Sequence, residues 1–217
     1  MTTPDIPDLE RRIEGRAGEC GVTLPDGAAS RLALPVRLVL RDNEALHLTT
    51  IVEPDELLER HLGESFEGAA LLPEEIGGTL LDLGSGNGYP GIPIAAVRPG
   101  LRPVLTEASR RKAEFLREVL ASCAEGGEVF EGQVQRAPDL RGMVADVITT
   151  RAMGAWQKIV PRMHAALAPD AHVLVWATAD AGPIFRRKVW PRFEIRGRRD
   201  LPAREACTIW HLKPIPR

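Results

Sequence analysis

The sequence predicts an α/β protein: a twisted, mostly parallel sheet with helices on both faces, an antiparallel edge at its C-terminal end and an N-terminal cap of helices. Three observations predict it. The first seventy residues carry the apolar spacing of amphipathic helices. From Gly77 onward, short apolar runs alternate with helical segments, the order that builds parallel sheets. The last two β-like runs follow one another directly, as an antiparallel pair does.

The N-terminal seventy residues are expected to form three helices. These helices begin near Asp8, Pro25 and Glu53. Pro35 lies in the second and should kink or interrupt it, because proline lacks an amide hydrogen and its ring crowds the preceding turn. The third has a proline and two acids in its first turn, where both are favourable. We assign residues 1–70 to a helical cap and residues 71–217 to the main domain.

The main domain is expected to begin with five strands. Their predicted ranges are 79–83, 102–106, 128–131, 144–149 and 172–176. Longer segments with one apolar face, 109–123 and 155–166, are expected to be helices between them. The runs 192–198 and 206–212 are expected to pair at the sheet edge.

Composition restricts the class of protein. Of 217 residues, 44% are hydrophobic and 27% are charged, a balance typical of globular domains. No apolar run approaches the roughly 18 residues of a membrane span. The first residues also lack the basic-then-apolar order of a signal peptide, so we expect a cytosolic protein without membrane contact. Three widely separated cysteines, Cys20, Cys123 and Cys207, predict reduced thiols rather than a metal site.

Charge is distributed unevenly along the chain. Residues 1–100 carry 8 basic and 17 acidic side chains, a net of −9, whereas residues 101–217 carry 20 basic and 13 acidic, a net of +7. Such asymmetry suits a protein with one positive face and a polyanionic partner. It equally suits two parts of one chain that attract each other. The sequence leaves both interpretations open.

The sharpest motif is a glycine loop directly after the first strand. It reads Asp82-Leu83-Gly84-Ser85-Gly86-Asn87-Gly88. Glycine is needed where the backbone turns tightly and approaches a ligand, and open α/β sheets bind ligands at the carboxyl ends of their strands. Glu107 ends the second strand, where a carboxylate can accept hydrogen bonds from both hydroxyls of a ribose.

Two nucleoside cofactors use such an arrangement. Nicotinamide dinucleotides need a Gly-x-Gly-x-x-Gly spacing and a helix start that holds a pyrophosphate. This chain has a Gly-x-Gly-x-Gly spacing, an acid two residues before it, and Pro90 and Pro93 at the next helix start. An acid suits the ammonium group of S-adenosylmethionine (SAM) and repels a pyrophosphate, so the motif favours SAM. The alternative to both cofactors is a tight turn that binds no ligand. The proposed contacts in the loop are Asp82, Gly84, Ser85, Gly86 and Gly88.

The chain resembles a known family at this motif. Residues 81–93 continue the loop into Tyr89-Pro90-Gly91-Ile92-Pro93, which resembles the small-subunit rRNA guanine-N7 methyltransferases, the RsmG or GidB family. The segments 48–50, 60–65, 111–117 and 150–152 are similar to further family segments, in the same order. The resemblance implies a Rossmann-like class I SAM methyltransferase that acts on rRNA in the small ribosomal subunit. We expect it to act as a monomer and without a metal.

The resemblance also implies site residues. The implied cofactor contacts are Gly84, Tyr89, Glu107, Val134, Gln135 and Arg151. Val134 and Gln135 would lie beside the adenine, and Arg151 would reach into the mouth of the active site as the candidate catalytic residue. Guanine N7 has a free lone pair, so positioning supplies most of the rate and no general base is needed. His61 is either a lid contact near the cofactor or a packing residue.

The chain departs from the family pattern at several positions. Gln133 and Gln135 replace an Arg-x-Glu pattern, Ala177 replaces a lysine, and His47 replaces an asparagine. These changes leave two alternatives open: a SAM methyltransferase for another RNA or a small molecule, and a SAM- or RNA-binding protein with weakened catalysis. A nicotinamide oxidoreductase is a more distant alternative. Three basic clusters, residues 110–112, 186–188 and 196–199, are candidate phosphate contacts. The four tryptophans are expected to serve packing.

Overall fold

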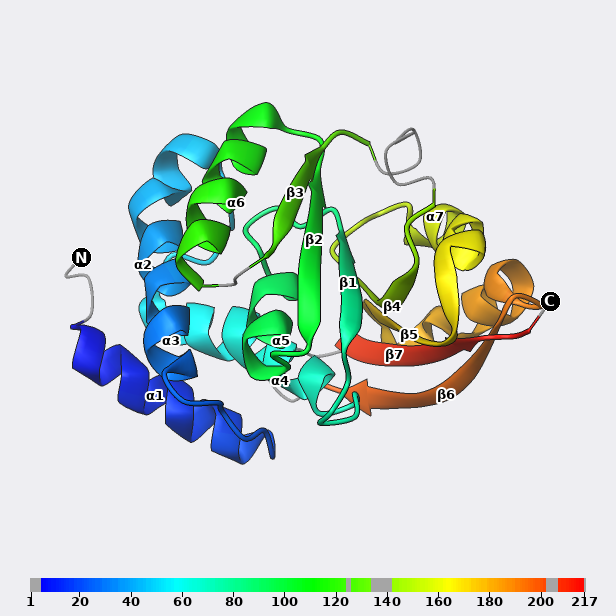
Figure 1. Cartoon of the computed structure of the whole chain (residues 1–217), viewed down its shortest axis with the longest axis horizontal. Coiled ribbons are helices and arrows are strands. Elements are labelled where there is room, and N and C mark those ends of the chain that lie inside the picture. The colour runs from blue at the N-terminus through cyan, green and yellow to red at the C-terminus, as the bar shows by residue number, and fades with distance from the viewer. Residues whose placement is uncertain (1–4, 124–125, 134–141, 202–206, 217) are drawn as a thin grey trace.

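The computed structural model describes residues 5–123, 126–133, 142–201 and 207–216. Its centre is a seven-stranded sheet in the order β3-β2-β1-β4-β5-β7-β6 (Figure 1). Strands β1 to β5 are parallel, and β7 runs antiparallel between β5 and β6. The predicted fold class, including the antiparallel C-terminal edge, is therefore confirmed.

Each predicted strand is present, with bounds shifted by a few residues. The strands are β1 Gly78–Leu83, β2 Leu101–Glu107, β3 Glu128–Glu131, β4 Ala145–Arg151, β5 Leu167–Thr178, β6 Phe193–Asp200 and β7 Cys207–Pro214. The largest extension is in β5, which begins five residues before its predicted start.

The helices surround this sheet. They are α1 Ile6–Glu19, α2 Ala28–Leu46, α3 Pro54–Leu57, α4 Glu64–Ala69, α5 Gly91–Val97, α6 Arg110–Cys123, α7 Trp156–Met163 and α8 Gly182–Ile184, with π-helical segments η1 Leu58–Gly63 and η6 Phe185–Val189 and 3₁₀ segments η4 His164–Ala166 and η5 Ala179–Ala181. Helices α1 to α6 lie on one side of the sheet, and α7 lies on the other (Figure 1).

Side chains alternate between two hydrophobic clusters, as the pleat of a strand requires. On β1, Leu80 joins the cluster beneath the N-terminal helices, whereas Leu81 and Leu83 join the cluster beneath α7 and η6. Strand β1 pairs with β2 on one side and β4 on the other. Strands β2 and β3 are therefore added on one side of β1 and the later strands on the other, so the strand order switches direction at β1. Such a switch point leaves a crevice at the carboxyl ends of the strands.

Of the two effects expected of Pro35, a kink or an interruption, the structure contradicts the interruption. Helix α2 continues through Pro35 from Ala28 to Leu46 without interruption. Pro35 is buried, and Leu32, Val36 and Val39 beside it are fully buried in the same cluster. Burial of this apolar face offsets the hydrogen bond that proline removes, because packing supplies most helix stability in proteins.

The third predicted helix contains an unexpected irregularity. Its span is helical from Pro54 to Ala69, but the π-helical segment η1 divides it into α3 and α4. Segments of this kind often occur at functional sites. His61 lies in η1.

Within the described residues, no helix has the length and apolar character needed to cross a membrane. Nor do those residues contain a cluster of three or more His, Cys, Asp or Glu side chains suited to a metal. Cys20 and Cys123 are buried, and burial raises the pKa of each thiol to about 12, so both stay protonated at neutral pH.

Candidate functional site

The glycine loop turns sharply at the end of β1. Gly84, Gly86 and Gly88 have φ angles of +72°, +56° and +91°, a region that side chains other than glycine rarely adopt. The end of β2 holds the loop in place. The Gly84 amide donates to Thr106 Oγ1 (3.1 Å), and the Ser85 amide donates to the Thr106 carbonyl (2.8 Å). Thr106 was not among the predicted site residues; a hydroxyl residue just before the strand-ending acid was its only signal in the sequence.

The glycines of the loop have different surroundings. A Cβ at Gly86 would meet nothing closer than the Gly84 carbonyl at 3.9 Å. A Cβ at Gly88 would lie 2.5 Å from Ile92 Cδ1, so Gly88 is needed for close packing of the loop on α5. Gly86 thus borders open space, whereas Gly88 faces the protein.

Glu107 joins the loop to β2. Its Oε2 accepts a hydrogen bond from the Gly86 amide (3.0 Å), and its Oε1 accepts one from the Ser109 amide (2.8 Å). These bonds hold the half-buried carboxylate at the end of the strand, as predicted. Each carboxylate oxygen has a further lone pair that can accept from a ligand.

Asp82 lies beneath the loop and is only 1% exposed. The Thr149 hydroxyl donates to its Oδ1 at 2.6 Å. Burial raises the pKa of the Asp82 carboxyl, and the hydrogen bonds from Thr149 and Ser85 oppose that rise. Asp82 does not line the pocket described next; its carboxyl lies beneath the loop, bonded to Thr149.

A pocket of about 260 Å³ opens beside the glycine loop. Its lining includes five of the predicted site residues: Gly84, Ser85, Gly86, Tyr89 and Arg151. The others come from two N-terminal segments, the glycine loop and the residue after β4: Leu48, Thr49, Thr50, Ile51, Arg60, His61, Asn87 and Ala152. The pocket therefore lies between the N-terminal helices and the carboxyl ends of β1 and β4.

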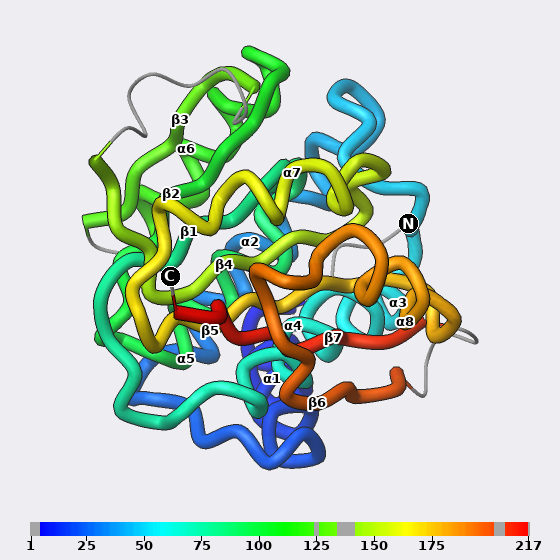
Figure 2. Tube along the Cα trace, turned by 90° about the vertical axis from the view of Figure 1, so that its right-hand side faces the viewer, coloured from blue at the N-terminus to red at the C-terminus, as the bar shows by residue number. Residues whose placement is uncertain are grey.

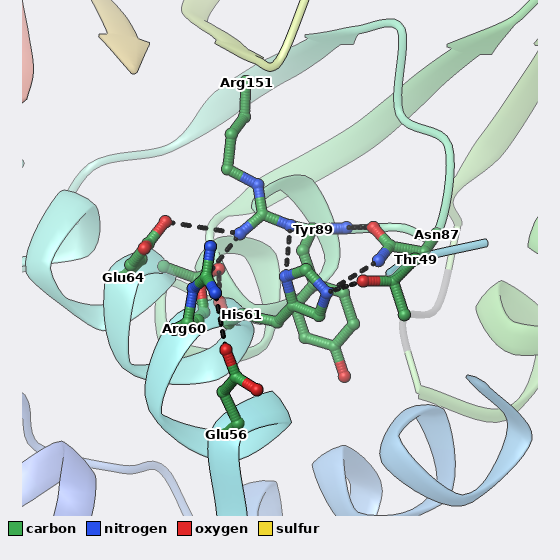
Figure 3. A network of polar contacts seen from close by, with 9 residues as sticks. Thr49, Glu56, Arg60, His61, Glu64, Asn87, Tyr89 and Arg151 are labelled. Atoms are coloured by element: carbon green, nitrogen blue, oxygen red, sulfur yellow. Dashed lines mark hydrogen bonds and ion pairs between the residues drawn. The ribbon is translucent and has the colours of Figure 1, made fainter. Parts of the chain in front are cut away.

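His61 is the centre of a polar network in this pocket (Figure 3). It is 8% exposed, and its ring stacks on Tyr89 with centroids 5.2 Å apart. Arg151 donates to Nδ1 (2.7 Å), and Nε2 lies 2.8 Å from Thr49 Oγ1 and 3.2 Å from Asn87 Nδ2. His61 therefore packs within the protein and also lines the pocket, so the lid contact near the cofactor stays a prediction.

Arg151 joins the sheet to the N-terminal helical run. It ends β4, and its side chain is only 8% exposed. It donates to the Arg60 carbonyl (3.0 Å) and lies 3.5 Å from the buried carboxylate of Glu64. Its guanidinium also lies 6.0 Å from the Tyr89 ring centroid. These contacts hold the cation at the edge of the pocket.

The remaining predicted positions lie elsewhere. Val134 and Gln135 are outside the described residues. Gln133 is exposed, and Ala177 lies near the end of β5 without lining the pocket. His47 is exposed too, and its backbone carbonyl accepts from Lys112 Nζ (2.9 Å).

Comparison with known proteins identifies the family. Residues 29–180 match the family model GidB, described as rRNA small subunit methyltransferase G. The chain belongs to the GidB family. The matched range includes Thr49, His61, the whole glycine loop and Arg151.

Curated members of the GidB family are similar over most of this chain. A protein named "Ribosomal RNA small subunit methyltransferase G" from Alkalilimnicola ehrlichii is 38% identical over 158 residues, which cover 73% of this chain and 68% of that protein. A protein of the same name from Sorangium cellulosum is 34% identical over 165 residues, covering 74% and 68%.

Solved structures share the fold of this GidB-family chain. A putative methyltransferase from Escherichia coli superposes with a TM-score of 0.58 at 15% identity, covering 73% of this chain and 87% of that one. A fibrillarin pre-rRNA processing protein from Methanococcus jannaschii superposes with a TM-score of 0.55 at 18% identity, covering 67% and 70%. At such low identity, the likeness shows the fold alone.

Proposed function

We propose that this GidB-family methyltransferase transfers the methyl group of SAM to N7 of a guanine in small-subunit rRNA. One observation carries the proposal: the open backbone at Gly86, bound to the Glu107 carboxylate, lies beside a pocket edged by the buried Arg151–His61 pair. The names of the curated relatives supply the acceptor class. Such an acceptor would place the protein in the cytosol.

The residues present fit the cofactor. The space above Gly86 accepts a ligand against bare backbone. The Glu107 oxygens are available to the ribose hydroxyls, and the Asp82 carboxyl lies buried beneath the loop. Val134 and Gln135 are proposed beside the adenine from the family resemblance alone.

The chemistry asks for positioning rather than for a general base. When bound, SAM supplies a methyl group already activated by its positively charged sulfur. Guanine N7 attacks with a lone pair and has no proton to lose. His61 accepts from Arg151 through one nitrogen and faces Thr49 with the other, so it is placed to orient Arg151. Arg151 and Tyr89 would then position the acceptor at the mouth of the pocket.

The test is transfer of a labelled methyl group from SAM to small ribosomal subunits isolated from cells that lack the modification. We expect label in small-subunit rRNA, at a guanine that becomes sensitive to the strand cleavage typical of N7-methylguanine. Label at another atom or in another RNA would favour a different acceptor. SAM binding by calorimetry without any transfer would favour a binding protein that has lost catalysis.

A further inference from the structure

The three basic clusters named from the sequence differ in their surroundings. In residues 110–112, Arg110 pairs with Glu114 (Nε–Oε1, 3.0 Å), Arg111 donates to the Ala45 carbonyl (3.1 Å), and Lys112 donates to the His47 carbonyl. This cluster helps to hold the helix α6 against the end of α2. Its charges are already engaged within the protein.

The cluster at residues 196–199 is also paired. Arg196 lies 3.3 Å from Glu194, and Arg198 lies 3.6 Å from Asp200. Arg199 forms an ion pair with Glu67, which is 5% exposed. The basic residues of both clusters are thus tied down, by acids in residues 196–199 and by one acid and two backbone carbonyls in residues 110–112.

The cluster at residues 186–188 is different. All three of its side chains are exposed, and η6 packs against α7, which carries two further exposed basic residues. Together with one basic residue after η6, the α7–η6 face consists of Lys158, Arg162, Arg186, Arg187, Lys188 and Arg192. None of the six forms an ion pair with another described residue. Segments 152–166 and 179–193 contain these six basic residues and a single acid, Asp180.

A short stretch of chain connects the edge of the pocket to this face. Ala152 lines the pocket, and Met153 Cε lies 3.0 Å from the position that a Cβ at Gly84 would take. Trp156 then begins α7 and packs on Phe185 of η6, with ring centroids 4.6 Å apart. Figure 2 shows α7 and the segment that follows β5 next to each other on the same side of the sheet.

We propose that the α7–η6 face binds the sugar–phosphate backbone of the rRNA strand whose guanine enters the pocket. The inference rests on the proposed function and adds where the RNA lies. Exposed arginines and lysines without acidic neighbours are the groups that neutralise phosphates, and they set register without reading sequence. Trp190 is 59% exposed two residues after Lys188 and offers an aromatic surface on which an unpaired base can stack.

The test compares two double variants that each remove two exposed charges. R187A/K188A changes the α7–η6 face, and R11A/R31A changes exposed arginines of helices α1 and α2 across the sheet. We measure KM and kcat for methyl transfer to small ribosomal subunits, SAM affinity by calorimetry, and binding of protein-free small-subunit rRNA as a function of salt.

For R187A/K188A we expect a KM for the particle raised about tenfold and a salt slope for rRNA binding reduced by roughly 1.5. SAM affinity should stay unchanged, and R11A/R31A should behave as the wild type. Wild-type KM and salt slope in R187A/K188A would overturn the docking surface and leave the proposed function intact. A wild-type protein that transfers no methyl group would refute the proposed function, while the salt slopes would still decide the docking surface. Equal losses in both variants would mean that net charge, not this face, drives binding.

Discussion

Gly84, Gly86 and Gly88 share a positive φ, but each meets different neighbours. A Cβ at Gly84 would press on the flexible end of Met153, and one at Gly88 on Ile92. Only Gly86 combines open space with a hydrogen bond to the Glu107 carboxylate. A substitution there tests ligand binding separately from packing.

The first prediction concerns Gly86→Val. The side chain should occupy cofactor space and lower SAM affinity at least tenfold, and the positive φ should cost about 1–2 kcal/mol of stability. Gly21→Val is a matched control, because Gly21 has a φ of +70° and nothing within 4 Å of its Cβ position. Calorimetry and thermal unfolding should show similar destabilisation in both variants and lost SAM binding only in the first. Unchanged affinity in Gly86→Val would remove the loop from the site.

The second prediction concerns Arg151→Lys. Lysine keeps the positive charge near Glu64. It lacks the planar guanidinium whose two terminal nitrogens bond His61 and the Arg60 carbonyl at the same time. We expect kcat to fall by about 100-fold, because a misplaced positioning group costs rate. Arg151→Ala is less informative, since it removes a cation beside the buried Glu64 carboxylate and should destabilise the fold by about 3–5 kcal/mol. Wild-type turnover in Arg151→Lys would mean that the charge alone matters.

At the scale of elements, the helical run 54–69 carries the pocket's N-terminal wall. The π-helical segment η1 holds His61, and its carbonyl at Arg60 accepts from Arg151 at the end of β4. Strand β4 and η1 are far apart in sequence, and their contact brings the pocket residues Arg60, His61 and Arg151 together.

The third prediction concerns the pairing of β5 with β7. His172 Nδ1 lies 2.9 Å from His211 Nε2, a hydrogen bond that requires an unprotonated nitrogen. Burial, then the Lys213 charge, lowers the pKa of both histidines to about 4. His211 lowers the pKa of His172 further, against the opposing effect of Asp170, and Arg196 lowers the pKa of His211 further. Both folded pKa values lie below the unfolded value of about 6.5.

As the pH falls, the unfolded chain protonates these histidines at a higher pH than the folded protein does. The free energy of unfolding should therefore fall as the pH drops from about 6.5 towards 4. Thermal melts between pH 7.5 and pH 4.5 should therefore show a smaller acid-dependent loss in the double variant H172Q/H211Q than in the wild type. Identical pH profiles of the two proteins would contradict this account. The wild type's melting temperature at pH 7.5 provides the reference for each comparison.

At the scale of the whole molecule, one hydrophobic cluster spans both predicted segments. Leu9, Leu32 and Phe66 of the N-terminal helices share it with Leu80 and Leu105 of the sheet. The division at residue 70 thus stays a prediction about organisation. The continuous cluster argues that the two segments depend on each other for folding.

The fourth prediction follows from this shared cluster. A chain limited to residues 71–217 should lose cooperative unfolding and bind hydrophobic dyes, because one face of its sheet would be uncovered. Co-expression with residues 1–70 should restore a sharp thermal transition. A sharp transition in residues 71–217 alone would establish an independent domain.

The uneven charge of the chain now has two explanations that operate together. Arg151–Glu64, Arg199–Glu67 and Arg41–Glu118 join the acidic and basic halves. The α7–η6 face keeps its six basic side chains outside such pairs within the described residues. Attraction between the halves and a positive face are therefore both present.

Elements and candidate residues differ in how far the sequence predicts them. Strand positions are predicted well, because buried strands read as short apolar runs, and the glycine loop is found from its spacing. Pro35 misleads, since the packing that carries α2 through it involves residues distant in the chain. The segment α8–η6 has no clear periodic signal and is not predicted.

Local chemistry along the chain determines the fold class, the bare backbone at Gly86 and the carboxylate of Glu107, because each depends on residues close in sequence. Folding alone decides that Arg151 meets His61 across 90 residues, and that residues 186–188 form no ion pair with another described residue, unlike the other two basic clusters. The physical reason is that burial and ion pairing depend on neighbours in space. A sequence pattern names the groups that can bind, and the packed structure decides which of them remain available to do so.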